Sequence, residues 1–278
     1  MNETVIDGSP YIEEIINPET FMPSEESQTI ITDEDIMYYD MSGDKYLVIF
    51  NHYEFEKTRY FNYRKPATRN GTEKDVERLE KVFGKLGFKI TTHDDLSHGE
   101  IFDAVVGFSK QNHKATSCVC FAFLTHGDKC GDLYASDRPY QFRDITMMLE
   151  SGDDGLVGKP KLFFVQACRG NLVDAGRRLE IDGSAASFVI PTHADFLVLY
   201  STVEDYVSFR DRDGSFMIQE LCNVIEEYQK SWDLLHMITL LHRRVAYNKI
   251  TFAPSHLAIH EKKQMPETRY SLTKLLKF

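Results

Sequence analysis

The sequence lacks the features that carry a chain into or across a membrane. None of its apolar runs approaches the roughly 20 residues that a membrane-spanning helix needs, and the longest are only the length of a β-strand. Residues 1–11 contain neither the basic region nor the apolar core of a secretion signal. Cysteine is scarce, with 5 in 278 residues, an odd number without the spacing of a disulfide framework. We therefore expect reduced thiols and a cytoplasmic protein without a membrane partner.

Positive charge is missing from the first part of the chain. Residues 1–44 contain twelve Asp and Glu and no Lys or Arg, so the remainder holds 31 acidic and 32 basic residues. Such an acidic stretch buries too little apolar surface to offset the entropy of ordering, and we expect residues 1–36 to be a disordered leader, or propeptide. The nearly neutral remainder has no basic patch, which argues against nucleic acid as a partner.

Apolar runs alternate with helical periodicity from residue 37 onward. Runs typical of buried strands occur at Tyr46–Phe50, Phe88–Thr92, Cys118–Leu124, Lys161–Gln166 and Phe196–Tyr200. Helical stripes lie between several of them, and the first helix begins near Thr72, a plausible N-cap, and ends at Gly87. Strands separated by helices predict an α/β fold with a mostly parallel sheet and helices on both faces.

Two of these strands end in residues that can perform nucleophilic catalysis. Leu124 is followed by Thr125-His126-Gly127, and Gln166 by Ala167-Cys168-Arg169-Gly170. The carboxyl ends of neighbouring parallel strands border the same cleft. A thiol with an ordinary pKa of about 8.5 needs a base to act near neutrality, and an imidazole can serve as that base. We predict that Cys168 is a nucleophile and His126 its acid/base partner, with the N–H groups of Gly127 and Cys168 as oxyanion donors.

The residues around these two positions resemble a known family. Gln166-Ala167-Cys168-Arg169-Gly170 matches the caspase nucleophile signature, and His126 lies 42 residues upstream, where roughly 50 is typical. Arg69-Asn70-Gly71-Thr72 and Val207-Ser208-Phe209-Arg210 resemble the segments that contribute the two specificity arginines. Two further segments resemble landmarks of the same family, namely Asp213-Gly214-Ser215-Phe216 and Gln264-Met265-Pro266. The resemblance covers residues 37–278 and implies a caspase-like three-layer fold, with a sheet of about six strands, and cleavage after aspartate.

The resemblance also implies a pocket for the substrate aspartate, built from Arg69, Gln166 and Arg210. Planar guanidinium groups hold a carboxylate through paired hydrogen bonds, which suits this task. It implies further that the backbone carbonyl of Ala67 orients the ring of His126. The other substrate-binding positions that it implies are Val207, Ser208, Phe209, Asp211 and Phe216.

Asp211 departs from the family pattern. It follows Arg210, where a neutral amide is expected if an acidic residue three positions before the cut aspartate is to be bound. A substrate carboxylate near Asp211 would be repelled. Val207 and Phe209 stand where many relatives have tyrosine and tryptophan, which leaves more room beside the aspartate. We therefore expect Ile or Val before the cut aspartate and a non-acidic outer residue.

Residues 171–194 show neither strand nor helix periodicity, and we expect a flexible processing loop there. The resemblance implies a zymogen that is cut in this loop into a large piece, residues 37–182, and a small piece, residues 183–278. Small residues enter a protease cleft easily, so the expected cuts follow Asp182, or else Asp174, and in the leader Asp7.

The implied partners follow from the same resemblance. They are protein substrates with exposed Asp-containing loops, an upstream activating protease and inhibitor proteins. A second copy is expected to pair through an edge strand near residues 267–274, because an exposed strand edge needs covering. The short polar leader resembles that of executioner-type enzymes, which act in apoptosis.

Other interpretations carry less weight. A caspase-like pseudoprotease that only binds partners remains the main alternative, although Cys168, His126 and both arginines are present. A related protease that cuts after basic residues conflicts with two arginines in the pocket. Cys118, Cys120 and Cys130 with His126 could resemble zinc ligands, but the turn that usually separates paired ligands is missing. We expect neither a metal nor another cofactor.

Overall fold

The computed structural model describes residues 37–128, 131–172, 194–211, 213–255 and 257–278. The sequence predictions for Asp7, Cys130, Asp174 and Asp182 lie outside these ranges. In the described part of the chain, no helix has both the length and the apolar character needed to cross a membrane.

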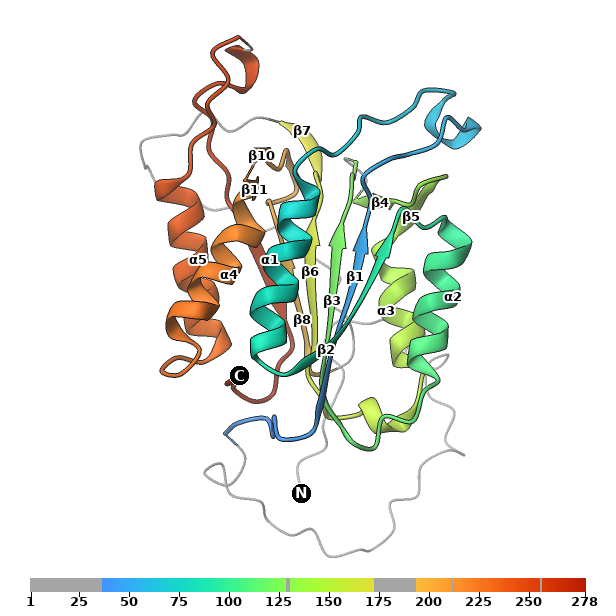
Figure 1. Ribbon diagram of the computed structural model, residues 1–278, viewed down its shortest axis with the longest axis vertical. Coiled ribbons are helices and arrows are strands. Elements are labelled where there is room, and N and C mark those ends of the chain that lie inside the picture. Colours follow the sequence, from blue (N-terminus) through green and yellow to red (C-terminus); the bar gives the residue numbers. More distant parts are fainter. Residues whose placement is uncertain (1–36, 129–130, 173–193, 212, 256) are drawn as a thin grey trace, which may run out of the picture. The chain divides into compact units, whose positions relative to one another are not determined.

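The centre of the fold is a six-stranded sheet (Figure 1). The strand order is β12-β8-β6-β3-β1-β2, and every pair is parallel except β12 with β8, which is antiparallel. The bounds are β1 Asp44–Asn51, β2 Phe88–Asp94, β3 Thr116–Leu124, β6 Lys161–Gln166, β8 Phe196–Tyr200 and β12 Glu267–Tyr270. The predicted α/β fold with a mostly parallel sheet of about six strands is therefore confirmed.

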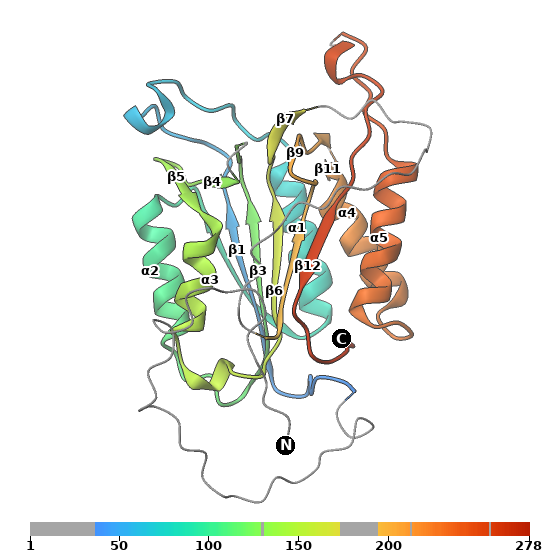
Figure 2. The same cartoon turned by 180° about the vertical axis from the view of Figure 1, so that it is seen from behind.

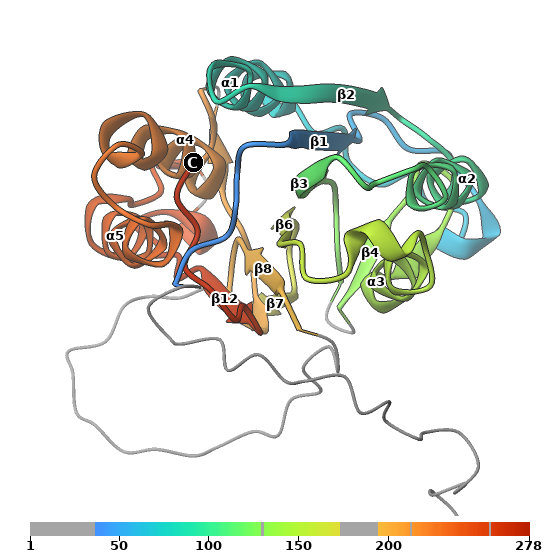
Figure 3. The same cartoon turned by 90° about the horizontal axis from the view of Figure 1, so that it is seen from below.

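In the described part of the chain, five helices cover the two faces of the sheet. Their bounds are α1 Thr72–Lys85, α2 His98–Ser109, α3 Phe142–Glu150, α4 Phe216–Tyr228 and α5 Leu234–Asn248. Seen from below, α1, α4 and α5 lie on one side of the sheet and α2 and α3 on the other (Figure 3). Short 3-10 turns occur at Arg59–Phe61, Asp154–Leu156 and Leu257–Ile259.

Strand β3 shows why the sheet is enclosed on both faces. All nine of its residues are buried. Cys118, Cys120, Ala122 and Leu124 belong to the core shared with α1, α4 and α5, whereas Val119, Phe121 and Phe123 belong to the core shared with α2 and α3. Successive side chains of a strand point to opposite faces, so a continuous apolar run fits a strand between two helical layers.

Three small two-stranded sheets lie outside the central sheet. They are β4 Asp132–Tyr134 with β5 Pro139–Gln141, β7 Gly170–Leu172 with β9 Asp205–Tyr206, and β10 Arg210–Asp211 with β11 Gly214–Ser215. Seen from behind, β12 forms the edge of the central sheet beside β8, and β7 and β9 lie beyond the upper ends of the strands (Figure 2).

The N-cap that we predicted for α1 is wrong by one residue. Gly71 is the N-cap, with φ of 89°, and Thr72 is the first helical residue. The hydroxyl of Thr72 is engaged elsewhere, because it accepts from Nη1 of Arg69 at 2.8 Å and donates to Oδ1 of Asn51 at 2.7 Å. A Cβ on Gly71 would lie 2.5 Å from the carbonyl oxygen of Asp211, so this turn requires glycine.

We expect Phe121→Ala to lower the free energy of unfolding by about 3–5 kcal/mol, because it leaves a cavity in the centre of the sheet. The ring of Phe121 is fully buried and stacks on Phe163, with 5.6 Å between centroids. Urea titration of both proteins measures the change. Leu257→Ala is the control, since Leu257 is 76% exposed and should change stability by less than about 0.5 kcal/mol. Equal effects of the two substitutions would contradict this account of the core.

Candidate active site

The candidate site lies at the carboxyl ends of β1, β3 and β6. The pairing register aligns Asn51 with Leu124, and Leu124 with Gln166, so the three strands end at the same level. The strands that precede His126 and Cys168 are therefore neighbours. The segments that follow them, together with β10 and β11, gather at the upper end of the sheet in Figure 1.

The thiol of Cys168 lies against the backbone of Ser208. The N–H of Ser208 donates to Sγ at 3.5 Å, and Sγ lies 3.9 Å from the carbonyl oxygen of the same residue. Cys168 is partly exposed, whereas Cys118, Cys120 and Cys222 are buried. Accessibility makes Cys168 the best candidate for a reactive thiol among these four. Its catalytic role stays a prediction.

One ring nitrogen of His126 is engaged by the backbone. Nε2 lies 2.7 Å from the carbonyl oxygen of Ala67. A carbonyl can only accept, so Nε2 carries a proton, and in the neutral ring Nδ1 is the free base. Burial lowers the pKa of His126 to about 4, and the positive charges of Arg69 and Arg210 act in the same direction. The ring is therefore neutral near pH 7 and able to accept a proton.

Gly127 is required by the close approach of two loops. A Cβ at this position would lie 2.3 Å from the carbonyl oxygen of Cys168 and 3.2 Å from Cβ of Ala167. The backbone of Cys168 is therefore the group that requires glycine here. The N–H groups of Gly127 and Cys168 donate no hydrogen bond to any residue that the structure describes. Both remain available as oxyanion donors, which stays a prediction.

Arg69 is a buried cation, with 1% of the residue exposed. Its Nη1 donates to the carbonyl oxygens of His52 at 3.0 Å and Leu124 at 2.7 Å, and to Thr72. Burial lowers the pKa of Arg69, and the charge of Arg210 lowers it further. Within the described residues, its other two nitrogens make no hydrogen bond, so they can receive a substrate carboxylate.

Arg210 is held beside the turn that precedes α1. Its Nε donates to the carbonyl oxygen of Asn70 at 2.7 Å, and its side-chain carbons lie within 3.7 Å of a Cβ built on Gly71. Burial lowers the pKa of this guanidinium. Because Asn70 follows Arg69 directly, the two predicted specificity arginines are brought together.

Gln166 completes the group of predicted pocket residues. The residue is 2% exposed, and its Nε2 donates to Oγ of Ser208 at 2.6 Å. Its Oε1 is buried and has no hydrogen-bond partner among the described residues. Ser208 therefore contacts both the predicted nucleophile and the predicted pocket.

The remaining predicted subsite residues have different surroundings. Val207 and Phe209 are partly buried, and Asp211 is exposed. The N–H of Phe209 donates to Oε1 of Gln264 at 2.7 Å, which fixes this segment to the chain before β12. Phe216 is 7% exposed and lies with its ring centroid 6.3 Å from that of Phe209. We expect Phe216 to support Phe209 from the core side.

The sequence analysis gave Arg169 no role of its own, although it follows Cys168. Its guanidinium forms an ion pair with Glu267 of β12 and lies 3.7 Å from Glu204. The same group lies over the ring of Tyr200, 4.3 Å from the centroid. The nucleophile loop is thus tied to the edge strand of the sheet. No local pattern could have revealed this, because Glu267 is 98 residues away.

A second missed feature is the packing of His126. The ring of Phe55 lies 4.9 Å from the ring of His126 and 5.9 Å from that of His52. His52 is fully buried, and its Nε2 donates to the carbonyl oxygen of Leu96 at 2.9 Å. The sequence signalled this packing only through the position of Phe55 shortly after β1, a neighbour of the strand that precedes His126.

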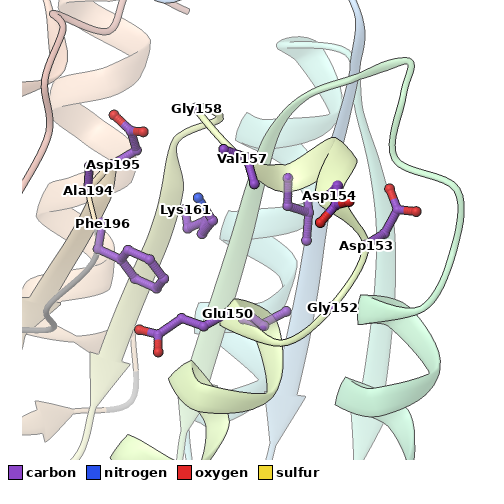
Figure 4. Close-up of a pocket in the computed structure, with 12 residues that line it drawn as sticks. Glu150, Gly152, Asp153, Asp154, Val157, Gly158, Lys161, Ala194, Asp195 and Phe196 are labelled. Atoms are coloured by element: carbon purple, nitrogen blue, oxygen red, sulfur yellow. The ribbon is translucent and has the colours of Figure 1, made fainter. Parts of the chain in front are cut away.

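A cavity of about 160 Å³ lies at the opposite end of the sheet (Figure 4). Lys161 and Phe196, the first residues of β6 and β8, form part of its lining, with Asp195, Glu150 and Val157 around them. None of the predicted site residues borders it. This cavity therefore lies apart from the chemistry that the strand ends carry.

The described part of the chain contains no set of ligands for the zinc site considered above. No three side chains of the metal-binding types come together there. Cys118 and Cys120 are buried on β3 with their sulfur atoms 4.0 Å apart.

Comparisons with known proteins point to one family. The family model described as "Caspase domain" matches residues 44–277. Caspase drICE of Drosophila melanogaster is 34% identical over 259 residues, which cover 90% of this chain and 74% of that protein. Caspase-3 of Mus musculus is 34% identical over 236 residues, covering 83% and 82%. The crystal structure of Caspase-1 from Spodoptera frugiperda matches with a TM-score of 0.78 and 34% identity, over 88% of this chain and 94% of that one.

Buried histidines should make the protein unstable to mild acid. Burial lowers the pKa of His52 to about 4, below the 6.5 or so of an unfolded histidine. The unfolded state therefore binds protons first, and the stability present above pH 6.5 is lost as pH falls toward 4. We expect His52→Gln, which can still donate to Leu96, to lose about 2 kcal/mol less than the wild type between pH 7 and 4.5. Urea titrations at both pH values test this, and parallel losses would contradict it.

Proposed function

The chain belongs to the caspase family and is a cysteine endopeptidase, and from that premise we propose that it cuts proteins after aspartate, with Cys168 as nucleophile and His126 as acid/base. The observation that carries the proposal is the meeting of Arg69, Arg210 and Gln166 beside Cys168. Arg210 is fixed next to Arg69 through Asn70, and Gln166 is fixed next to Cys168 through Ser208.

The proposed reaction begins with proton transfer from the thiol of Cys168 to Nδ1 of His126. The thiolate attacks the backbone carbonyl carbon of the substrate aspartate, and the N–H groups of Gly127 and Cys168 stabilise the oxyanion. The intermediate collapses as the carbon–nitrogen bond breaks, and the imidazolium gives its proton to the leaving amine. A water then gives a proton to Nδ1 and attacks the thioester, which releases the acid and the thiol.

The arrangement around His126 suits this sequence of proton transfers. Its hydrogen bond to Ala67 keeps Nε2 protonated and leaves Nδ1 as the base. A backbone carbonyl thus takes the orienting position that an acidic side chain holds in other triads. Burial keeps the ring neutral near pH 7, so Nδ1 has a free lone pair for the thiol proton.

The aspartate specificity follows from the free nitrogens of the two arginines. Each guanidinium has one nitrogen bound to protein and others that remain available within the described residues. Charge-assisted bonds to a carboxylate are stronger than neutral ones, and a basic substrate side chain would meet two like charges. A protease that cuts after basic residues is thus a poor fit.

Activation and assembly belong to the same proposal. The chain is a cytoplasmic zymogen acting in apoptosis, with a leader before residue 37 and a processing cut after Asp182, or else Asp174. An upstream protease makes the first cut in the cell, the concentrated protein also cuts itself at the same site, and inhibitor proteins limit the activity. Two copies pair along β12, whose outer edge no other strand of the described chain covers.

The outer specificity is set by Asp211. Its side chain is exposed, and its Oδ1 accepts from the N–H of Asp213 at 2.8 Å, which holds the carboxylate in a tight turn directly after Arg210. A fixed carboxylate disfavours an acidic residue three positions before the cut aspartate. The candidate cut at Asp182 fits this, since Leu179 occupies that outer position and Ile181 precedes the aspartate.

Mass spectrometry of the incubated protein, wild type beside Cys168→Ala, tests the catalytic proposal. We expect wild type to be cut after Asp182, whereas Cys168→Ala stays intact. Turnover of an aspartyl peptide should fall at least about 100-fold in Cys168→Ala and in His126→Ala. Weak turnover by loop-cut protein, with no loss in Cys168→Ala, would instead support a pseudoprotease. A first cut after Asp174 would move the processing site but not the catalytic roles.

A positional peptide library tests the outer specificity. We expect faster turnover with an apolar residue or Thr at the outermost position and Ile or Val before the aspartate than with Asp-Glu-Val-Asp. Asp211→Asn keeps the oxygen that binds Asp213 and removes only the charge, so it should shift the outer preference toward Asp. Wild-type preference for Asp at the outermost position would refute the role of Asp211.

A further inference from the structure

Asp75 is a buried carboxylate in the first turn of α1 for which the proposed reaction has no use. None of the residue is exposed. Its Oδ1 accepts from the N–H of Ser215 and from Nε2 of Gln219, both at 2.9 Å. Its Oδ2 has no hydrogen-bond partner among the described residues. Burying such a group is costly unless a positive charge lies close to it.

Burial raises the pKa of Asp75, and the positive charge of Arg69 acts against that rise, although neither pocket arginine forms an ion pair with Asp75. Arg210 is paired with Ser215 between β10 and β11, and Ser215 donates to Asp75. Arg69 contacts the first residue of the same helix through Thr72. Burial lowers the pKa of both guanidiniums. The carboxylate of Asp75 is the strongest of the interactions that oppose this shift.

The backbone around Asp75 is shaped to accept the carboxylate. Gly214 has φ of +113°, and a Cβ there would lie 2.5 Å from Oδ1 of Asp75 and 2.3 Å from Nε2 of Gln219. On the other side, a Cβ on Gly71 would lie 2.5 Å from the carbonyl oxygen of Asp211. The turn that carries Arg210 is thus pressed against the beginning of α1 at two points. Asp75 is the side chain that binds the two together.

We propose that Asp75 is a positioning residue and the internal counter-charge of the aspartate pocket. It holds Arg210 beside Arg69 and offsets one of their two positive charges. The empty pocket then carries a net charge of +1, and one substrate carboxylate makes it neutral. A substrate amide in the same place would leave that charge unbalanced. This inference rests on the proposed function, since it takes the pocket to be one for aspartate.

Thermal unfolding tests the counter-charge without any ligand. The parent protein is the full chain carrying Cys168→Ala. Asp75→Asn retains an oxygen for Ser215 and Gln219 but removes the charge, and should lower Tm by roughly 5 °C or more. Adding Arg210→Gln to this variant should raise Tm again, because it removes the surplus positive charge. The same Arg210→Gln change in the parent should not raise Tm.

Gln219→Leu is the matched control, since it removes one hydrogen bond of Asp75 and no charge. It should destabilise the chain, but Arg210→Gln should not rescue it. Rescue in both backgrounds, or in neither, would overturn the counter-charge role. If Asp75→Asn does not fold, the double variant with Arg210→Gln decides the question, because balanced charge predicts that it folds.

Peptides that end in Asp or Asn provide a second readout, which a purely structural role would not change. An Asp-ending peptide should raise Tm more in Asp75→Asn than in the parent, and the Asp-over-Asn affinity ratio should grow several-fold. Equal shifts in parent and variant would overturn the inference. For this assay the parent and the variant are first cut in the processing loop by an added protease. If neither peptide stabilises the cut parent, the aspartate specificity fails instead, while the ligand-free rescue still decides the role of Asp75.

Discussion

The guanidinium of Arg69 is enclosed by protein, where an uncompensated charge would cost several kcal/mol. Its Nη1 donates to carbonyl oxygens just beyond β1 and at the end of β3, and to the hydroxyl that opens α1. A single buried cation therefore ties two central strands and a helix together at the upper end of the sheet. The same side chain is proposed to bind the substrate carboxylate in the pocket. Removing it would take a hydrogen-bond donor from three polar groups of the fold, so here the fold and the specificity depend on one side chain.

Backbone groups, more than side chains, define the rest of the site. The carbonyl of Ala67 sets the tautomer of His126, and the amide of Ser208 lies against the thiol of Cys168. Gly127 lets its loop approach the backbone of Cys168 closely. Backbone positions follow from strand register, and register is strongly specified in a sheet buried on both faces. The precision of the site thus comes from the sheet beneath it.

Most of the central sheet could be predicted because its strands are buried on both faces. Lys161–Gln166 and Phe196–Tyr200 were predicted to the residue, since an apolar run between polar neighbours marks a strand of this kind. The beginning of α1 was predicted one residue late. A threonine before a helical stripe usually caps it, whereas this one is taken by Arg69 and Asn51, which no local rule could foresee.

The sequence by itself determined the fold class, the family and the identity of the candidate residues, because hydrophobic period and a short signature are local properties. Only the tertiary structure decided how those residues meet. Arg169 binds Glu267 on the edge strand, Phe55 packs on the ring of His126, and Asp75 accepts a hydrogen bond from the N–H of Ser215. Each of these contacts joins residues far apart in the chain, and its worth depends on burial. Burial is a property of the packed sheet and its helices, and it cannot be assigned to any residue before the chain has folded.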